Sequence, residues 1–323
     1  MATNVMSEIQ VQAGPGMWTP PSSVTDHLGK PLPPERDFFV APPREIGPVK
    51  SAYSSLKREI EAKTAQTRVA IVALAAAAGV GAGVGIDYLT AIHSPIWPAV
   101  IAALAALIAW GVTGFKHLCN FVGAEGCAEF KCKGGRENIT QKKLFNFKDA
   151  WAVSTSMTRH FTNGVYTGTS FGFYWYPPDG GKPVYQIVGR HKANLKTPPV
   201  QNAFNFARAV EMAWDNHLVP RLDAQLREKG YINFYMGDKR WARLGLGFLE
   251  IVEKDGSVNR CEASDIGSAK LASGTFTLSR KDAKSKLFGL LGSSGVFKFN
   301  YGIMYNAQVF LYAFQRLLNI KVE

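Results

Sequence analysis

Two long apolar runs dominate the pattern of hydrophobic and polar residues along this chain. Between Val69 and Phe115 the only charged side chain is Asp87. The runs over residues 69–86 and 96–115 each approach the roughly 20 residues that a helix needs to cross a hydrocarbon core. The pattern therefore predicts two transmembrane helices, over residues 69–89 and 96–115. A buried Ala-rich hairpin of a soluble protein would give the same signal.

Charges beside the two runs predict how they are oriented. The linker between them has no lysine or arginine, whereas basic residues precede the first run and follow the second: Lys57, Arg58, Lys63, Arg68 and Lys116. Because basic flanks stay in the cytosol, both termini are expected to be cytosolic.

Alternating glycines in the first run predict a tight helix contact. Gly79 with Gly83, and Gly81 with Gly85, have the spacing at which helix backbones approach closely. The same run superficially matches a dinucleotide-binding loop, but no strand-to-helix switch or following acidic residue supports that interpretation. The pattern leaves open whether the second helix or a partner chain, including a second copy, covers the glycines.

The residues before the first run form two segments of different composition. Residues 1–50 are rich in proline and lack a long apolar run, so we expect a disordered leader that cannot offset its chain entropy by burial. Residues 31–34 could instead present a polyproline II ligand. Residues 51–68 alternate charges around Leu56 and Ile60, which suits a juxtamembrane helix. Residues 51–116 would then comprise this juxtamembrane helix and the two transmembrane helices.

Beyond residue 116 the pattern acquires the two-residue period of strands. Apolar residues alternate on both sides of Asn163-Gly164, a pair typical of a two-residue hairpin turn. Strands do not alternate with helices, which favours antiparallel sheets. Shorter strands are expected near residues 232–236, 247–252, 257–262 and 295–300.

Two amphipathic helices punctuate these strands. The first runs from about Gln201 to Lys229, with a kink expected at Pro220. The second follows Asn306, a residue type that favours the N-cap position. Their apolar stripes are Phe206, Val210, Ala213, Trp214 and Leu218, and then Val309, Phe310, Ala313, Phe314, Leu317 and Leu318. Strands followed by one helix thus occur twice, which predicts an α+β fold with two modules over residues 117–230 and 231–323.

Four stretches carry a resemblance to a known group of proteins. They are residues 122–126, residues 163–169, residues 232–249 with Trp241, and the pair Tyr305-Asn306. In these stretches the chain resembles prokaryotic membrane-anchored proteins with pleckstrin-homology-like domains. The resemblance implies two curved sheets, each closed by a helix, that bind or assemble, and it implies a prokaryotic plasma (inner) membrane. The helix from Gln201 and the leader have no counterpart in that group.

Charge is concentrated in the same region. The formal net charge is +12, and residues 117–323 hold 28 lysines and arginines against 17 aspartates and glutamates. Such a basic domain beside a bilayer suits anionic membrane lipids or an acidic protein partner, although a scattered solvated surface gives the same balance. Nucleic acid is a weaker match, because no recognised binding module accompanies the charge.

Three groups of basic residues are candidates for binding an anionic headgroup or an acidic partner. They are Lys131, Lys133 and Arg136, then Lys239, Arg240 and Arg243 around Trp241, and finally Arg280, Lys281, Lys284 and Lys286. Phosphate groups would suit them. General attraction to the membrane leaflet is the alternative, and we favour it because the complete spacing of a headgroup motif is missing.

The sequence offers no catalytic or metal constellation, and we expect no cofactor. Glu211 and Asp215 lie one helical turn apart and His217 projects elsewhere, so we interpret these residues as surface polar groups. The four cysteines lack the paired spacing of a zinc site or a disulfide framework. We therefore expect a two-pass membrane protein that presents a basic tandem domain to the cytosol as a binding or assembly scaffold. A membrane-associated enzyme or enzyme subunit, with a site assembled from distant residues, is the alternative.

Overall fold

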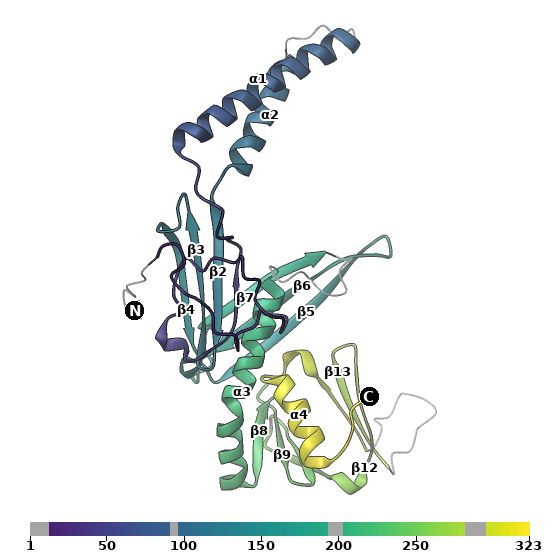
Figure 1. Cartoon of the computed structure of the whole chain (residues 1–323). Helices are drawn as coiled ribbons and strands as arrows, with labels where there is room; N and C mark the ends of the chain where they lie inside the picture. The colour runs from purple at the N-terminus through teal and green to yellow at the C-terminus, as the bar shows by residue number, and fades with distance from the viewer. Residues whose placement is uncertain (1–12, 91–95, 193–202, 282–294) are drawn as a thin grey trace.

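The structure is a computed structural model that describes residues 13–90, 96–192, 203–281 and 295–323. Its first half contains seven strands and three helices (Figure 1). The strands are β1 (Val49–Ser54), β2 (Lys116–Gly123), β3 (Gly126–Lys133), β4 (Ile139–Asn146), β5 (Ala152–Thr162), β6 (Val165–Tyr176) and β7 (Tyr185–Lys192). The helices are α1 (Ala65–Thr90), α2 (Ile96–Val112) and α3 (Ala203–Lys229).

The described residues of the second half contain seven strands and one α-helix. These elements are β8 (Tyr231–Tyr235), β9 (Trp241–Gly245), β10 (Phe248–Val252), β11 (Val258–Glu262), β12 (Ile266–Ala272), β13 (Thr275–Arg280), β14 (Val296–Asn300) and α4 (Ala307–Leu318). Each half builds an antiparallel sheet of four strands, then one of three strands, and ends in a helix. The described residues therefore form an α+β fold with the same order of elements twice. We call these halves the first and second modules.

The helices α1 and α2 are inserted between the first two strands of the first module. Strand β1 pairs with β2, with Ala52 opposite Phe121 and Ser54 opposite Cys119. The helices pack antiparallel and project away from the sheets at the top of Figure 1. Both ends of this helical hairpin are thus attached to neighbouring strands.

The N-terminal segment from residue 13 onward is ordered, which corrects the expectation of a disordered leader. Phe38, Phe39 and Val40 are fully buried in a core of their own with Phe121 of β2. Isolated bridges also join this segment to other strands, including one between Thr25 and Ser51. Apolar residues between the prolines thus bury enough surface to fix the segment, which we call the strap (residues 13–48).

Residues 51–68 likewise do not form the predicted helix. Residues 49–54 are strand β1, and α1 begins only at Ala65. The local charge pattern suited a helix, but hydrogen bonding to β2 and burial of Ala52 decide the conformation.

The predicted β-hairpin is present as β5 and β6. Asn163 and Gly164 have φ angles of 50° and 78°, as a type I′ turn requires. No individual strand was predicted at the positions of β2, β3, β4, β7, β9, β12 and β13.

Both amphipathic helices are present, with one difference at a cap. The stripe of α4 is buried at Val309, Phe310 and Phe314, and α3 continues through Pro220. Asn306 precedes α4 in the left-handed region, but its side chain makes no capping bond. Its Oδ1 instead accepts hydrogen bonds from Val153 N (2.9 Å) and Trp214 Nε1 (3.0 Å) of the first module.

That asparagine belongs to the junction between the two modules. Tyr305 stacks on Tyr176 of β6 at 5.0 Å, and Trp151 lies 6.3 Å from Trp241 between ring centroids. One hydrophobic core runs through both modules and includes both helices α3 and α4. The second module therefore packs against the first, on the side opposite the helical hairpin (Figure 1).

Candidate functional site

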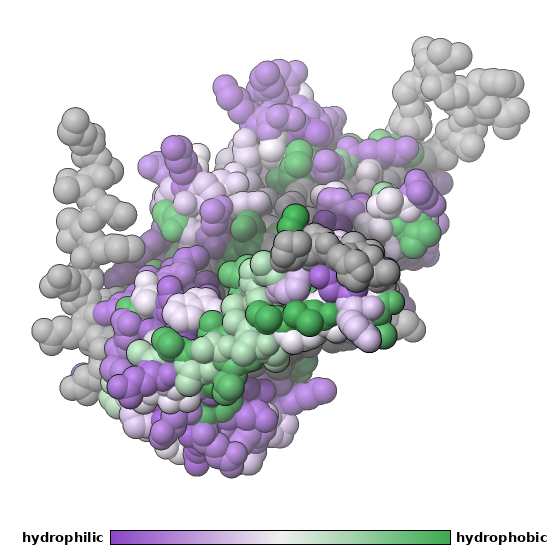
Figure 2. Space-filling model, turned by 90° about the horizontal axis from the view of Figure 1, so that it is seen from above, coloured by the Kyte–Doolittle hydropathy of each residue, from purple (hydrophilic) through white to green (hydrophobic). Residues whose placement is uncertain are grey.

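Helix α1 presents an apolar surface to the exterior. It has 26 residues, which corresponds to a length of about 39 Å and exceeds a hydrocarbon core of about 30 Å. Among the described helices it is the one that is long and apolar enough to cross a membrane; α2 is apolar but has 17 residues. Figure 2 shows hydrophobic residues gathered in a band over this hairpin, within a largely hydrophilic surface.

The four alternating glycines of α1 divide into two faces. A Cβ atom at Gly79 would lie 2.7 Å from Ala102 Cα, and one at Gly83 would overlap Pro98 Cα. Gly81 and Gly85 have open space instead. Helix α2 thus covers the first pair and leaves the second pair uncovered.

Aromatic and basic side chains mark the base of the hairpin. The guanidinium of Arg68 lies 4.2 Å from the ring centroid of Trp110, and its Nη2 donates to Trp110 O at 3.3 Å. Arg136 Nη2 donates to the carbonyls of Arg58 (2.9 Å) and Ile60 (2.7 Å), and its Nε lies 3.3 Å from the buried Asp37 Oδ2. Arg136 therefore ties the β3–β4 turn to the strap.

The first predicted basic group is thus partly occupied by contacts within the chain. Lys131 Nζ lies 3.7 Å from Glu129 Oε1. Lys133 is exposed at the end of β3, opposite Lys116 of β2. These two lysines remain accessible beside the base of the helical hairpin.

The second predicted group lies around the β8–β9 turn. Arg240 pairs with Glu253 at 2.7 Å, and Arg243 pairs with Glu250 at 3.7 Å. Lys239 is exposed, in the left-handed region of the turn. Two of the three cations are thus balanced by carboxylates of the same module.

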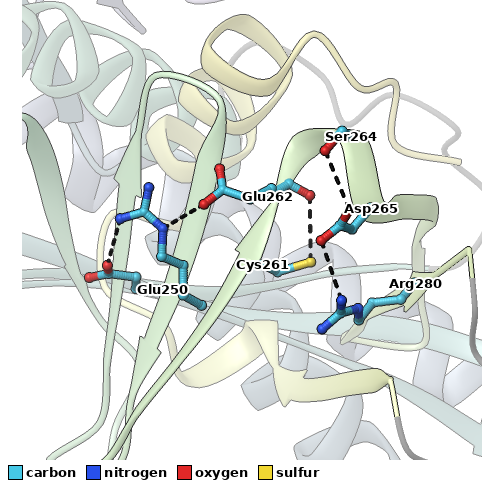
Figure 3. Close-up of polar contacts among 7 residues, drawn as sticks. Glu250, Cys261, Glu262, Ser264, Asp265 and Arg280 are labelled. Carbon is cyan, nitrogen blue, oxygen red and sulfur yellow. Dashed lines mark hydrogen bonds and ion pairs between the residues drawn. The ribbon is translucent and has the colours of Figure 1, made fainter.

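The third predicted group is also partly balanced. Figure 3 shows the carboxylate of Asp265 facing Arg280, with 3.3 Å between Oδ2 and Nη2. Lys281 is exposed, and Lys284 and Lys286 lie outside the described residues. In the same view Glu250 and Glu262 hold an arginine, Arg260, at 3.2 and 2.7 Å. The predicted cations that the structure describes therefore lie on different elements: the β3–β4 hairpin, the β8–β9 turn with β9, and the end of β13.

A cavity of about 670 Å³ opens between the strap and helix α3. Its apolar lining includes Leu28, Val122 and Met212, and Lys50 and His217 are among its polar lining residues. This cavity was not predicted, because residues 1–50 were expected to be disordered. The apolar triplet Phe38-Phe39-Val40 was the available signal that the strap folds back onto the sheet.

Two titratable side chains of this cavity, His27 and Asp26, already have hydrogen-bond partners. His27 Nδ1 accepts from Ser51 Oγ (2.9 Å), and Nε2 donates to Asn120 Oδ1 (2.8 Å). Burial lowers the pKa of His27 to about 4. Asp26 Oδ1 accepts the backbone N–H groups of Leu28 and Lys30. These residues hold the strap in shape, and neither ring nitrogen of His27 is free for proton transfer.

Glu211 is buried and Asp215 is half-buried at the module junction, so the interpretation of these two acids as surface polar groups is wrong, whereas His217 is exposed. Glu211 is 2% exposed, accepts from Thr155 Oγ1 at 2.9 Å and pairs with Arg208. Burial and the charge of Glu211 raise the pKa of Asp215 to about 7. Burial and the charges of both carboxylates also raise the pKa of Tyr301 in the second module. The four-residue spacing placed these two acids on the face of α3 that packs inward.

The four cysteines are all buried and none forms a disulfide. Burial raises the pKa of the thiols of Cys119, Cys127 and Cys132. Within the part of the chain that the structure describes, no group of three or more histidine, cysteine or acidic residues could hold a metal ion. Thiolate chemistry is therefore disfavoured at these three positions.

This chain matches no known protein family and none of the curated proteins with which it was compared.

Proposed function

We propose that this chain is a two-pass integral membrane protein that presents a tandem pleckstrin-homology-like domain to the cytosol as a binding or assembly module. The observation that carries the proposal is the outward-facing apolar surface of α1, a helix of sufficient length to cross a bilayer. In a soluble protein that surface would remain in contact with water, at a large free-energy cost.

Two crossings follow from how the hairpin is attached. The chain leaves from β1 and returns to β2, and these strands pair directly. If α1 crosses the membrane, α2 must bring the chain back. The 17 residues of α2 correspond to about 26 Å, close to the thickness of a hydrocarbon core.

Residues at the base of the hairpin support cytosolic termini. Arg68 on Trp110, together with exposed Lys116 and Lys133, forms the mixture of aromatic and basic groups that favours a cytosolic membrane interface. The uncovered Gly81 and Gly85 leave room for a helix of a protein partner or of a second copy.

The repeated order of four strands, three strands and one helix supports the pleckstrin-homology-like interpretation. Domains of this kind function mainly by binding, which suits a scaffold in a prokaryotic plasma membrane. The paired cations argue for general attraction to the leaflet over a dedicated headgroup site in the three predicted basic groups.

Membrane extraction and cysteine accessibility test this proposal. The full chain should remain in membranes at alkaline pH. A cysteine introduced at Ser94 should react from outside intact cells, and one at Thr277 should react only after the membrane is opened. Release at alkaline pH would contradict membrane integration, and the reverse labelling pattern would contradict the topology.

The cavity between the strap and α3 is the observation that favours the alternative of a membrane-associated enzyme or enzyme subunit. Its volume would admit a small molecule. The hydrogen bonds of His27 and Asp26 leave these groups occupied, so the cavity suits binding better than acid–base catalysis. Turnover of a small molecule that is abolished by Met212→Trp, a substitution in the cavity lining, would favour the enzyme.

A further inference from the structure

The far end of the β5–β6 hairpin exposes apolar side chains that nothing in the described structure covers. Phe161 is 61% exposed and Val165 is 67% exposed. Further along β6, away from the turn, the ring centroid of Phe171 lies 5.2 Å from that of Phe204 of α3. The hydrophobic core therefore reaches Phe171 but not the end of the hairpin. We call residues 161–166 the tip.

The tip holds its side chains in a fixed arrangement. Asn163 and Gly164 form the tight turn, and the rings of Phe161 and Tyr166 lie 5.7 Å apart between centroids. The Tyr166 hydroxyl is also hydrogen-bonded to Thr169 Oγ1. An apolar group presented on a rigid strand pair loses little conformational entropy when it is buried against another surface.

Charge around the tip is of one sign. Strands β5, β6 and β7 contain no aspartate or glutamate. Arg159, Arg190 and Lys192 lie next to the tip, are exposed, and form no ion pair among the described residues. By contrast, five of the predicted cations are paired: Lys131, Arg136, Arg240, Arg243 and Arg280.

The β5–β6 hairpin projects from the module, and its sheet carries these cations on both faces. In Figure 1 the β5–β6 hairpin projects from the first module to the right and slightly upward, below α1 and α2, which rise from the top of the module and lean to the right. Arg159 lies on one face of the sheet and Arg190 and Lys192 lie on the other, because they occupy alternate positions in the register. Cations on both faces suit a tip that enters a surface end-on.

We propose that the tip is a second membrane contact, in which Phe161 and Val165 enter the interface of an anionic leaflet and the three cations meet its headgroups. This inference rests on the proposed function, because α1 and α2 would hold the first module against the same leaflet. Aromatic residues favour the interfacial zone, and basic residues near an anionic surface gain from its potential.

Site-directed fluorescence on the full chain tests the proposal. An environment-sensitive probe is attached at Val165→Cys in nanodiscs containing phosphatidylglycerol and a lipid-borne nitroxide quencher. A probe at Asp179→Cys, in the turn at the opposite end of β6, is the matched control. A probe at Leu74→Cys on the exposed surface of α1 reports on membrane insertion.

We expect quenching at positions 165 and 74 but not at 179. Replacing Arg159, Arg190 and Lys192 with glutamine should weaken the partition of the tip into the leaflet by about a hundredfold, since each basic residue contributes about a factor of five. Quenching at position 74 should not change. The same selective loss at position 165 is expected in nanodiscs made of phosphatidylcholine alone.

The possible failures differ in what they overturn. Quenching at 74 with none at 165 would overturn the second contact and leave the proposed function standing. Absence of quenching at 74 would overturn the proposed function and this inference together. Protection of position 165 that depends on protein concentration, and not on lipid, would show that the tip binds protein and would overturn the lipid assignment.

Discussion

The two modules share one order of elements but differ in what is added to it. The first carries the strap and the α1–α2 insertion and ends in the 27-residue helix α3, whereas the described residues of the second carry no such addition and end in the 12-residue helix α4. The strap and the α1–α2 insertion leave the order of the paired strands unchanged. The difference shows how a repeated unit is specialised: segments inserted between strands, or laid across a sheet, leave the pairing of the strands intact.

The two closing helices differ in the same way. Helix α4 buries an apolar stripe, whereas α3 also buries Glu211 and places Asp215 at the junction. Charged groups are retained inside the first module where it meets the second. Substitutions in each module can test whether these differences affect stability as well as architecture.

The largest expected effect comes from removing a buried side chain of the strap. Phe39→Ala should destabilise the first module by about 3 to 5 kcal/mol, because Phe39 is fully buried. Urea unfolding in detergent and limited proteolysis measure the loss. Phe314→Ala in α4 is the matched control, which should open the second module instead. A stability unchanged by Phe39→Ala would mean that the strap is a spacer.

The next effect concerns pH at the junction. The pKa of Asp215 is raised from 3.8 to about 7 in the folded chain, so its contribution to stability is full below pH 4 and is lost as pH rises to 7. Asp215→Asn should therefore stabilise the chain above pH 7 by about 2 to 4 kcal/mol and have no effect near pH 4.

Urea unfolding of both chains from pH 4 to 8 measures this difference. His27, whose pKa is lowered to about 4, destabilises the folded chain as pH falls below 6.5. Because His27 is present in both proteins, its contribution cancels in the difference between their free energies of unfolding at each pH. A difference that does not vary with pH would contradict the burial of Asp215.

A third prediction separates the two glycine faces of α1. Gly83→Leu should destabilise the hairpin by about 1 to 3 kcal/mol, because the side chain would overlap Pro98. Gly81→Leu should preserve hairpin stability, since the space around Gly81 is open within one chain. Thermal unfolding in detergent compares them. If Gly81→Leu alone disrupts assembly, its face binds a second helix.

The smallest expected effect tests how firmly the modules are joined. Asn306→Ala removes the acceptor for Val153 N and Trp214 Nε1 and should cost about 1 to 2 kcal/mol. Gln308→Ala, an exposed change on the same helix, is the control. Proteolysis near Gly230 that increases only with Asn306→Ala would locate the loss at the junction. Equal behaviour of both variants would indicate that the modules are joined by other contacts.

Several elements could be read from local patterns because one physical rule governs each. The apolar run of α1, the Asn163-Gly164 turn and the stripe of α4 follow from apolar composition, positive φ angles and helical periodicity, respectively. These rules need only neighbouring residues. They identified the fold class and the repeated order of strands and helix.

The environment of the polar residues required the tertiary structure. Arg136 is held by Asp37, and Glu211 by Thr155, across separations of 99 and 56 residues. The cavity likewise forms only when the strap meets α3. The sequence by itself determined the apolar hairpin and the periodic elements, because these depend on local composition. Only the tertiary structure decided which charges are paired and which are free, because pairing depends on segments that are distant along the chain.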